Sequence, residues 1–396
     1  MSKAMKKLLV LNGSHSDIQL IQAGKKLGYY VYTTGNRPDL IGHAYADEYI
    51  CGDFSKPEEI YELFKDKELD AVCSCANDFG AITASYLSDR LGLPGHDPYE
   101  TTLILHHKDK FKRFSAEHDI HTPRAVNFQS IDEALSYKER HYPMIVKPID
   151  LTGGKGISRA DSDEEYEAAV RNAFERSPKK RIVAEPFIVG TQHSFSTFLV
   201  DRKVAAYFSD NEYSYLNPYL VSTSGGPATN VDKAKKILID DAEKIASLLD
   251  LRDGVFHYQY LLSEDGTPHI LEITRRCSGD WYSEPVEHAT GIPWAEWIVR
   301  SECGLPCDDF PKNAVQKGFC GRHCIMGDRN GTVKGLYISD EIRPYIYDSI
   351  QWWKPGYRID NYMSDKIGIL FLEYENEEQM LDIVSRITDL VQIEYE

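Results

Sequence analysis

The chain has 396 residues and a formal net charge of −17, with 42% hydrophobic and 27% charged residues. This length allows two or three domains around a large core, and the composition is that of an ordinary globular protein. The acidic balance argues against nucleic acid or an anionic membrane as the main partner. No apolar run approaches the roughly 18 residues of a membrane span. Eight cysteines do not make a disulfide scaffold at this length, so a reducing cytoplasm is the simplest compartment.

The N-terminal part alternates short apolar strands with helices. Strands are expected at 7–11, 29–33, 45–50 and 70–74, and helices at 18–27, 57–67 and 79–91. This alternation predicts an open parallel α/β sheet. The first loop lacks the GxGxxG dinucleotide fingerprint. The loops 12–17 and 77–78 follow strands at the carboxyl edge, where such sheets bind ligands, and simple turn chemistry accounts for them equally well.

The middle of the chain changes in character. A helix is expected at 107–118, and the strand 144–148 leads into a glycine-rich loop at 150–157. Further elements are expected at 163–176 (helix), 181–189, 194–199 and 203–209 (strands), and 232–249 (helix). The segment 210–230 has no clear period and is interpreted as an extended loop or lid. Its tyrosines either line a pocket or pack internally.

A hairpin is predicted at 254–279, with its turn at 264–268. Glu272 lies between Leu271 and Ile273, so its side chain points to the opposite face of the strand. Gln259 on the outgoing strand can face it, and Arg276 follows four residues later. A carboxylate, an amide and a guanidinium on one patch suit magnesium and phosphate chemistry.

A smaller α+β segment closes the chain. A helix is expected at 294–303 and again at 377–391, with strands at 318–326, 331–337, 351–353 and 367–373. Among the cysteines, the run Cys320-Gly-Arg-His-Cys324 is the only arrangement that hints at a metal. Its spacing matches neither the usual zinc pairs nor a haem-attachment motif, which favours free thiols.

The order and spacing of these features resemble the ATP-grasp superfamily of carboxylate–amine ligases, over nearly the whole chain. The subgroup that includes amino-acid ligases fits the C-terminal segment. The resemblance implies a fold of mixed α/β and α+β class. An open parallel α/β domain would span 1–105, an ATP-grasp domain 106–310 with its lid at about 124–188, and a small α+β subdomain 311–396.

The resemblance also implies which residues hold ATP. Lys110 and Lys147 match the two lysines that neutralise the α- and β-phosphates, and the lid loop matches Gly153, Gly154, Lys155 and Gly156. Glu185, Phe187 and Ile188 match the adenine hinge. Gln192, followed by His193, occupies the position of the ribose acid. By strand alternation His257 lies on the side of Gln259, as a candidate phosphate or substrate contact.

At the metal end, Glu272 matches the family's second acid, while Gln259 and Thr274 stand where the family has an acid and an asparagine. Amide and hydroxyl oxygens can bind magnesium but provide less charge compensation. One weakly bound ion, a substitute ligand such as Asp280, or an altered activity all remain open. Arg276 matches the arginine that orients the substrate carboxylate and stabilises an acyl-phosphate.

The implied activity is ATP- and magnesium-dependent joining of a small-molecule carboxylate to an amine through an acyl-phosphate, with release of ADP. No nucleic acid or membrane partner is expected, and dimers are common among proteins of this kind. Two other functions remain open. One is a carbamoyl- or carboxy-phosphate-forming enzyme with a single grasp unit. The other is a nucleotide-binding regulatory or scaffold protein with a weakened metal site.

Overall fold

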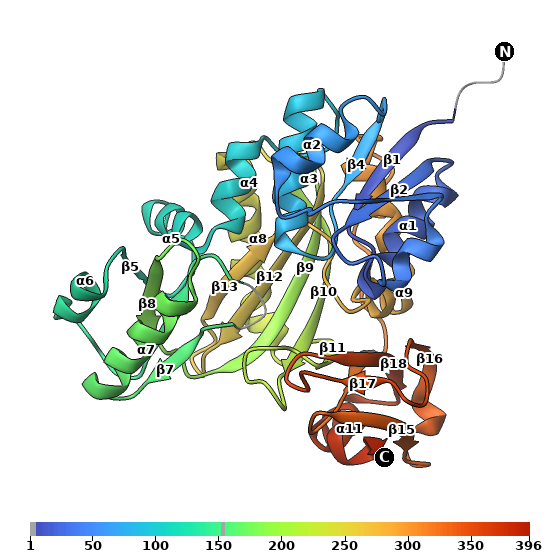
Figure 1. Cartoon of the computed structure of the whole chain (residues 1–396). Coiled ribbons are helices and arrows are strands. Elements are labelled where there is room, and N and C mark those ends of the chain that lie inside the picture. The colour runs from blue at the N-terminus through green and yellow to red at the C-terminus, as the bar shows by residue number, and fades with distance from the viewer. Residues whose placement is uncertain (1–4, 152–154) are drawn as a thin grey trace.

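The computed structural model of the chain describes residues 5–151 and 155–396. A parallel sheet at the N-terminal end stands beside a long antiparallel sheet (Figure 1). A small antiparallel sheet lies on the far side of the long sheet from the parallel one. The C-terminal strands lie at the lower right of this view, below the N-terminal domain. The mixed α/β and α+β class predicted from the sequence is confirmed.

The N-terminal sheet has the order β3-β2-β1-β4, and all its pairings are parallel, as predicted. Its strands and helices are β1 Lys7–Leu11, β2 Tyr30–Gly35, β3 Glu48–Cys51, β4 Ala71–Cys73, α1 Ile18–Lys26, α2 Pro57–Phe64, α3 Asp78–Leu91, and the 3-10 turns η1 His15–Asp17 and η2 Ile41–Tyr45. Helix α3 begins at Asn77, whose Oδ1 accepts the N–H of Phe79 at 2.9 Å. It ends at Gly92, in the left-handed conformation with φ 67°. This capping places Asn77 and Asp78 at the carboxyl edge of the sheet.

Two short helices, α4 Tyr99–His106 and α5 Lys108–Glu117, lead to the small sheet, whose order is β5-β8-β6-β7. Its elements are β5 Val126–Phe128, β6 Met144–Pro148, β7 Ser158–Ala160, β8 Ile182–Pro186, α6 Ile131–Ser136 and α7 Asp163–Arg176. Helix α7 packs on this sheet around a core of its own, which includes Val146, Tyr166 and Val170. The lid expected from the sequence is therefore a separately cored unit.

The long sheet is antiparallel throughout, with the order β13-β12-β9-β10-β11-β14-β18-β16. Its strands are β9 Thr191–Val200, β10 Lys203–Tyr213, β11 Thr223–Gly226, β12 Gly254–Leu262, β13 Pro268–Thr274, β14 Phe319–Met326, β16 Ile346–Gln351 and β18 Lys366–Tyr374. Helix α8 (Val231–Leu248) packs against it over an apolar core. The sheet continues across the predicted domain bound at 310/311, and the bounds themselves stay a prediction.

The remaining elements are α9 Ser283–Thr290, α10 Trp294–Glu302, the sheet β17-β15-β19 (Arg358–Ile359, Gly331–Ile338, Val391–Tyr395), η3 Arg343–Tyr345 and α11 Glu377–Leu390. Two expectations were wrong. The segment 210–230 is not a continuous loop, because β10 runs to Tyr213 and β11 lies within it. The strand expected at 351–353 is β16, which ends at Gln351.

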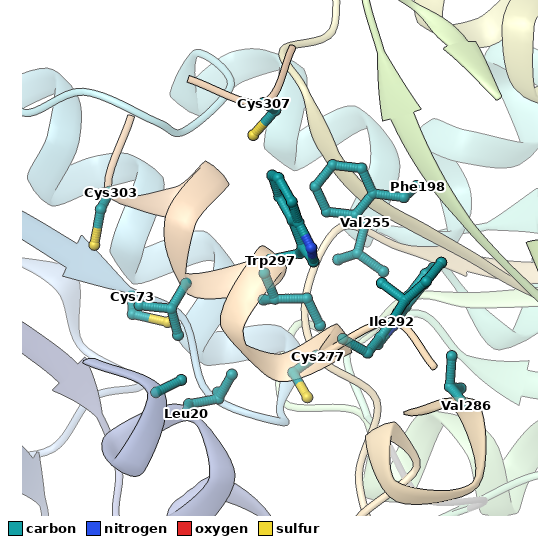
Figure 2. Close-up of a cluster of buried hydrophobic side chains, with 14 of the residues drawn as sticks. Leu20, Cys73, Phe198, Val255, Cys277, Val286, Ile292, Trp297, Cys303 and Cys307 are labelled. Atoms are coloured by element: carbon teal, nitrogen blue, oxygen red, sulfur yellow. The ribbon is translucent and has the colours of Figure 1, made fainter. Parts of the chain in front are cut away.

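One apolar core joins the N-terminal sheet to the long sheet. Figure 2 shows Trp297 of α10 beside Phe198 and Val255 of the long sheet, with Leu20 and Cys73 of the N-terminal domain across the helix. The thiols of Cys73, Cys277, Cys303 and Cys307 also belong to this core. All eight cysteines are free, as favoured by the sequence. The two sheets are therefore held together by packing rather than by a flexible linker.

Candidate active site

A cavity of about 380 Å³ lies where the N-terminal sheet, the lid and the long sheet meet. Several candidate residues line it: Asp78, Lys108, Lys147, Lys155, Gln192, Glu212, His257, Gln259, Glu272, Thr274, Arg276, Asp280 and Arg322. Most of the predicted site residues are thus brought together. Gly153 and Gly154 lie outside the described residues.

The hairpin β12–β13 supplies one wall. Gln259 pairs with Glu272 in the strand register, and His257 pairs with Thr274, as the alternation of side chains predicted. Thr274 is buried, and its Oγ1 has no hydrogen-bond partner among the described residues. Burial lowers the pKa of His257 to about 3, so its imidazole is neutral at physiological pH.

Glu212 is a cavity residue that sequence reasoning missed. It lies on β10, which β9 separates from the hairpin in the sheet. Its carboxylate accepts from Gln259 Nε2 at 2.8 and 3.0 Å and from Gln192 Nε2 at 2.9 Å. Burial, followed by the neighbouring Asp210, raises the pKa of Glu212 to about 7. Its place in a segment without a clear period gave no signal for this role.

Arg276 faces the cavity and connects it to the N-terminal domain. Its Nε donates to Asp78 Oδ1 at 2.8 Å, and the same oxygen lies 3.2 Å from Nδ1 of His106. Burial acts to raise the pKa of Asp78, but Arg276 and His106 outweigh it and lower that pKa. Since Asp78 is the first residue of α3, directly after the loop that follows β4, this end of the loop contacts a cavity residue.

A second arginine reaches the cavity from β14. Arg322 Nη1 lies 3.6 Å from Asp280 Oδ2, whose carboxylate also contacts Lys366 Nζ at 2.5 Å and His15 Nε2 at 3.3 Å. Burial opposes ionisation, but Lys366, His15 and Arg322 lower the pKa of Asp280. Because Arg322, Lys366 and His15 already surround this carboxylate, Asp280 is a poor substitute for a missing metal ligand.

Arg322 belongs to the run Cys320–Cys324. In the sequence this run hinted at a metal site because of its thiols and its histidine. The described part of the chain contains no group of three or more His, Cys, Asp or Glu side chains placed to hold a metal ion. His323 is buried and bonds Thr223 Oγ1 through Nδ1 at 2.7 Å. The arginine between the glycine and the histidine is therefore the residue that connects this run to the cavity.

Of the two predicted ATP lysines, Lys147 has the expected place. Its Nζ lies 2.5 Å from Glu185 Oε1, and Lys112 Nζ lies 3.1 Å from Glu185 Oε2, all three side chains being buried. Burial acts to raise the pKa of Glu185, but Lys112 and Lys147 outweigh it and lower that pKa to about 2. Burial lowers the pKa of Lys112 to about 8.

The assignment of Lys110 is corrected by its position. It lies 4.0 Å from the exposed Glu100 and does not line the cavity. Residues four apart share a helix face, so α5 turns Lys108 and Lys112 inward and Lys110 outward. Lys108 lines the cavity, 3.9 Å from Glu272, and donates to the carbonyl of Leu151 at 3.0 Å.

Several other predicted contacts lie beside the cavity rather than in its lining, among them Glu185, Phe187, Ile188 and His193. The side chain of His193 is buried and bonds Thr191 Oγ1, because alternation along β9 sends it to the face opposite Gln192. Phe187 donates its N–H to Pro143 and packs under Arg159, and Ile188 follows it. His193 therefore points away from Gln192, the predicted ribose contact, and the adenine contacts of Glu185, Phe187 and Ile188 stay predictions.

The lid loop reaches the cavity through Lys155 and Ile157. Gly156 between them has φ 76°, and a Cβ there would lie 2.8 Å from the ring of Pro148. Only glycine fits this position without strain.

No helix in the described ranges is long and apolar enough to cross a membrane.

The lid with its buried Lys147, the antiparallel sheet and the cavity lined by carboxylates and arginines define an ATP-grasp protein. The chain belongs to the family described as carbamoyl-phosphate synthase L chain, ATP binding domain, whose model matches residues 107–309. The matched region begins one residue before α5 and extends beyond α10, so it includes the lid and the hairpin.

Similarity to individual proteins is more distant. The chain is 26% identical over 226 residues to a phosphoribosylamine–glycine ligase of Vibrio vulnificus (strain YJ016), which covers 52% of each chain. It thus spans about half the length of this curated relative. The fold matches an L-amino acid ligase from Bacillus licheniformis, with a TM-score of 0.82, 20% identity and 100% of both chains covered.

A second structural match is the biotin carboxylase domain dimer of a 2-oxoglutarate carboxylase from Hydrogenobacter thermophilus, in complex with MgADP, ADP and bicarbonate. Its TM-score is 0.79 at 18% identity, over 99% of this chain and 91% of that one. At these identities the two structures establish the fold.

Proposed function

We propose that the protein is an ATP-dependent ligase that activates a small-molecule carboxylate as an acyl-phosphate and couples it to an amine. The observation that carries the proposal is that Arg276 and Arg322 reach one cavity that is also lined by Glu272 and Lys147. Guanidinium groups suit carboxylate and phosphoryl oxygens, and lysine suits the phosphates of a nucleotide. The ligase names of the relatives support the same reaction class.

The donor set fits a magnesium ion. Glu272, Gln259 and Thr274 present carboxylate, amide and hydroxyl oxygens from neighbouring strands, and the buried Thr274 Oγ1 has no protein partner within the described ranges. Magnesium prefers such oxygen ligands. When bound, the ion would neutralise charge on the nucleotide phosphates.

The reaction requires two displacements. A carboxylate oxygen attacks the γ-phosphorus of ATP, the bond to the bridging oxygen breaks, and ADP leaves. The amine then attacks the acyl carbon, phosphate leaves and the nitrogen loses a proton, which gives the amide. Arg276 and Arg322 would hold the carboxylate and the developing charge on its phosphate, and Lys108 and Lys147 would hold the nucleotide. The lid would exclude water from the acyl-phosphate.

Two further points belong to the proposal. The protein would act in a reducing cytoplasm, since its eight cysteines are free thiols and most are buried. A homodimer is the proposed assembly, and the dimer of the Hydrogenobacter biotin carboxylase domain is consistent with it.

The test is ADP release by purified protein with magnesium-ATP and mixtures of amino acids or other carboxylates. Release that requires both a carboxylate and an amine is expected, with an amide identified by mass spectrometry. Turnover stimulated by bicarbonate alone would favour the carboxy-phosphate-forming alternative. ADP binding without any substrate-dependent turnover would favour the regulatory or scaffold alternative.

Arg276 gives a site-specific test. Arg276→Ala should abolish amide formation, by at least about 100-fold, while ATP affinity stays within about threefold, because a charge-assisted contact to the reacting group is lost. Equilibrium dialysis measures the affinity and mass spectrometry the product. Loss of ATP binding in a folded variant would contradict the role given to Arg276.

A further inference from the structure

Two amide side chains converge on one buried carboxylate at the floor of the cavity. Gln192 of β9 and Gln259 of β12 both donate Nε2–H bonds to Glu212 of β10, at 2.8–3.0 Å. The three strands are neighbours in the long sheet, in the order β12-β9-β10. Glu212 is only 7% exposed, so its bonding partners are mainly these two amides.

This arrangement fixes which end of each amide faces the carboxylate. An ionised carboxylate only accepts hydrogen bonds, whereas an amide carries donors on nitrogen and acceptor lone pairs on oxygen. In the structure the NH₂ groups of Gln192 and Gln259 face Glu212, which is the orientation that an ionised carboxylate requires. Within the described part of the chain neither Oε1 accepts a hydrogen bond, and both residues line the cavity.

The amide of Gln259 lines the cavity together with two other side chains that carry oxygen donors, Glu272 and Thr274. Gln259 is the register partner of Glu272, and Thr274, one strand alternation further, has a buried Oγ1 without a partner in the described ranges. The three oxygens face one cavity from two paired strands. An amide in this set contributes to cation binding only if its oxygen, and not its nitrogen, points inward.

We propose that Glu212 is a positioning residue that locks Gln259 with Oε1 toward the cavity, and so converts a neutral amide into a cation ligand. Glu212 also supplies the negative charge that an acid at position 259 would have carried, although it contacts Gln259 and not the cation itself. The inference rests on the proposed function, because it requires a divalent cation beside the nucleotide. Partners of this kind that orient a ligand typically change metal affinity by about 10–100-fold.

The experiment measures Mn²⁺ binding to the full chain with saturating ADP, by electron paramagnetic resonance of free Mn²⁺. Glu212→Gln should weaken Mn²⁺ binding about 10–100-fold. A glutamine at position 212 can both donate and accept hydrogen bonds, so it no longer dictates which end of the Gln259 amide faces the cavity. Gln259→Leu should weaken it to a similar degree. The double variant Glu212→Gln/Gln259→Leu should bind Mn²⁺ no more weakly than Gln259→Leu alone, because the two residues act as one unit.

Glu212→Gln with Gln259→Glu provides a second variant that keeps the charge of the cavity. A carboxylate at 259 has oxygens at both ends and needs no orientation, so Mn²⁺ affinity should return to within about threefold of the unmodified protein. Loss of Mn²⁺ binding in this folded variant would overturn the inference. It also keeps the proposal testable if Glu212→Gln alone does not fold.

Three other results would decide against the positioning role. Unchanged Mn²⁺ affinity in Glu212→Gln would overturn it while leaving the proposed function intact. Additive losses in the double variant would also overturn it, because Glu212 would then contact the cation independently. If the unmodified protein binds ADP but no Mn²⁺, the inference and the metal dependence of the proposed function both fail.

Discussion

The lysines of α5 show how helix phase assigns a role to single residues. Lys108, Lys110 and Lys112 occupy alternate positions, yet only Lys108 and Lys112 face the cavity side. Sequence similarity identified this cluster but selected the wrong member. Three lysines within five residues all fit a spacing pattern, and only the packing of the helix against the lid distinguishes them.

A matched pair of variants tests this phase. Lys108→Ala should weaken ATP binding roughly 10–100-fold, since a charge-assisted contact is worth about 1.5–3 kcal/mol. Lys110→Ala should leave it within about twofold, because its only ion pair in the described ranges is an exposed one with Glu100. Isothermal titration with ATP measures both. The opposite order of effects would restore Lys110 as the nucleotide ligand.

The buried triad Lys112–Glu185–Lys147 predicts a pH-dependent stability. Glu185→Gln leaves two buried ammonium groups without a counter-charge, which should lower the free energy of unfolding by about 3–5 kcal/mol at pH 7. The pKa of Glu185 is about 2 in the folded protein and 4.5 ordinarily. A lowered pKa stabilises the fold above pH 4.5, and this contribution is lost as the pH falls toward 2.

Urea denaturation at pH 7, 5, 4 and 3 measures the difference in the free energy of unfolding between the variant and the unmodified protein. We expect the difference to be nearly constant between pH 7 and 5 and to shrink at pH 4 and below. An exposed control, Glu167→Gln, removes the acid of an i,i+4 pair with Arg171 and should change stability by less than about 0.5 kcal/mol. A constant difference down to pH 3 would contradict the role assigned to Glu185.

Among the helices and strands, those with a regular pattern of polar and apolar residues could be predicted from the sequence. The hairpin β12–β13 alternates polar and apolar residues, so its pairing, including Gln259 opposite Glu272, could be predicted. Strands β6 and β14 and helix α7 are likewise apolar or amphipathic over their whole length. Elements that bury a regular apolar face give a signal in the sequence.

Strand β10 beyond Ser209 and strand β11 gave no such signal. Their residues Asp210, Glu212, Thr223 and Ser224 are polar although the strands lie inside the long sheet. Polar side chains are needed there because they line or support the cavity, so function removed the apolar period that marks a strand. Glu212 was missed for this reason. Arg322 lies on β14, a strand that the sequence did predict, and it was missed because β14 meets the hairpin only through the sheet order β9-β10-β11-β14.

At the scale of the whole molecule, the site depends on how the N-terminal domain is fixed to the long sheet. Asp78 follows β4 of the N-terminal domain, and Arg276 follows β13 of the long sheet. Nε of Arg276 nevertheless lies 2.8 Å from Asp78 Oδ1. The core around Trp297 joins the two parts, with Phe310 5.1 Å and Phe198 6.1 Å from its ring. Packing far from the chemistry therefore sets the spacing of two cavity walls.

Trp297→Ala should expose this dependence. Loss of a buried tryptophan in a close-packed core should lower the free energy of unfolding by about 3–5 kcal/mol. Hydrogen exchange followed by mass spectrometry should become faster in β1 and in β12 together, since both adjoin the shared core. As a control, Val170→Ala removes volume from the separate core of the lid and should speed exchange in β6 and β8 only. Faster exchange confined to β1, or to β12, after Trp297→Ala would mean that the two sheets open independently and that the core does not hold Asp78 against Arg276.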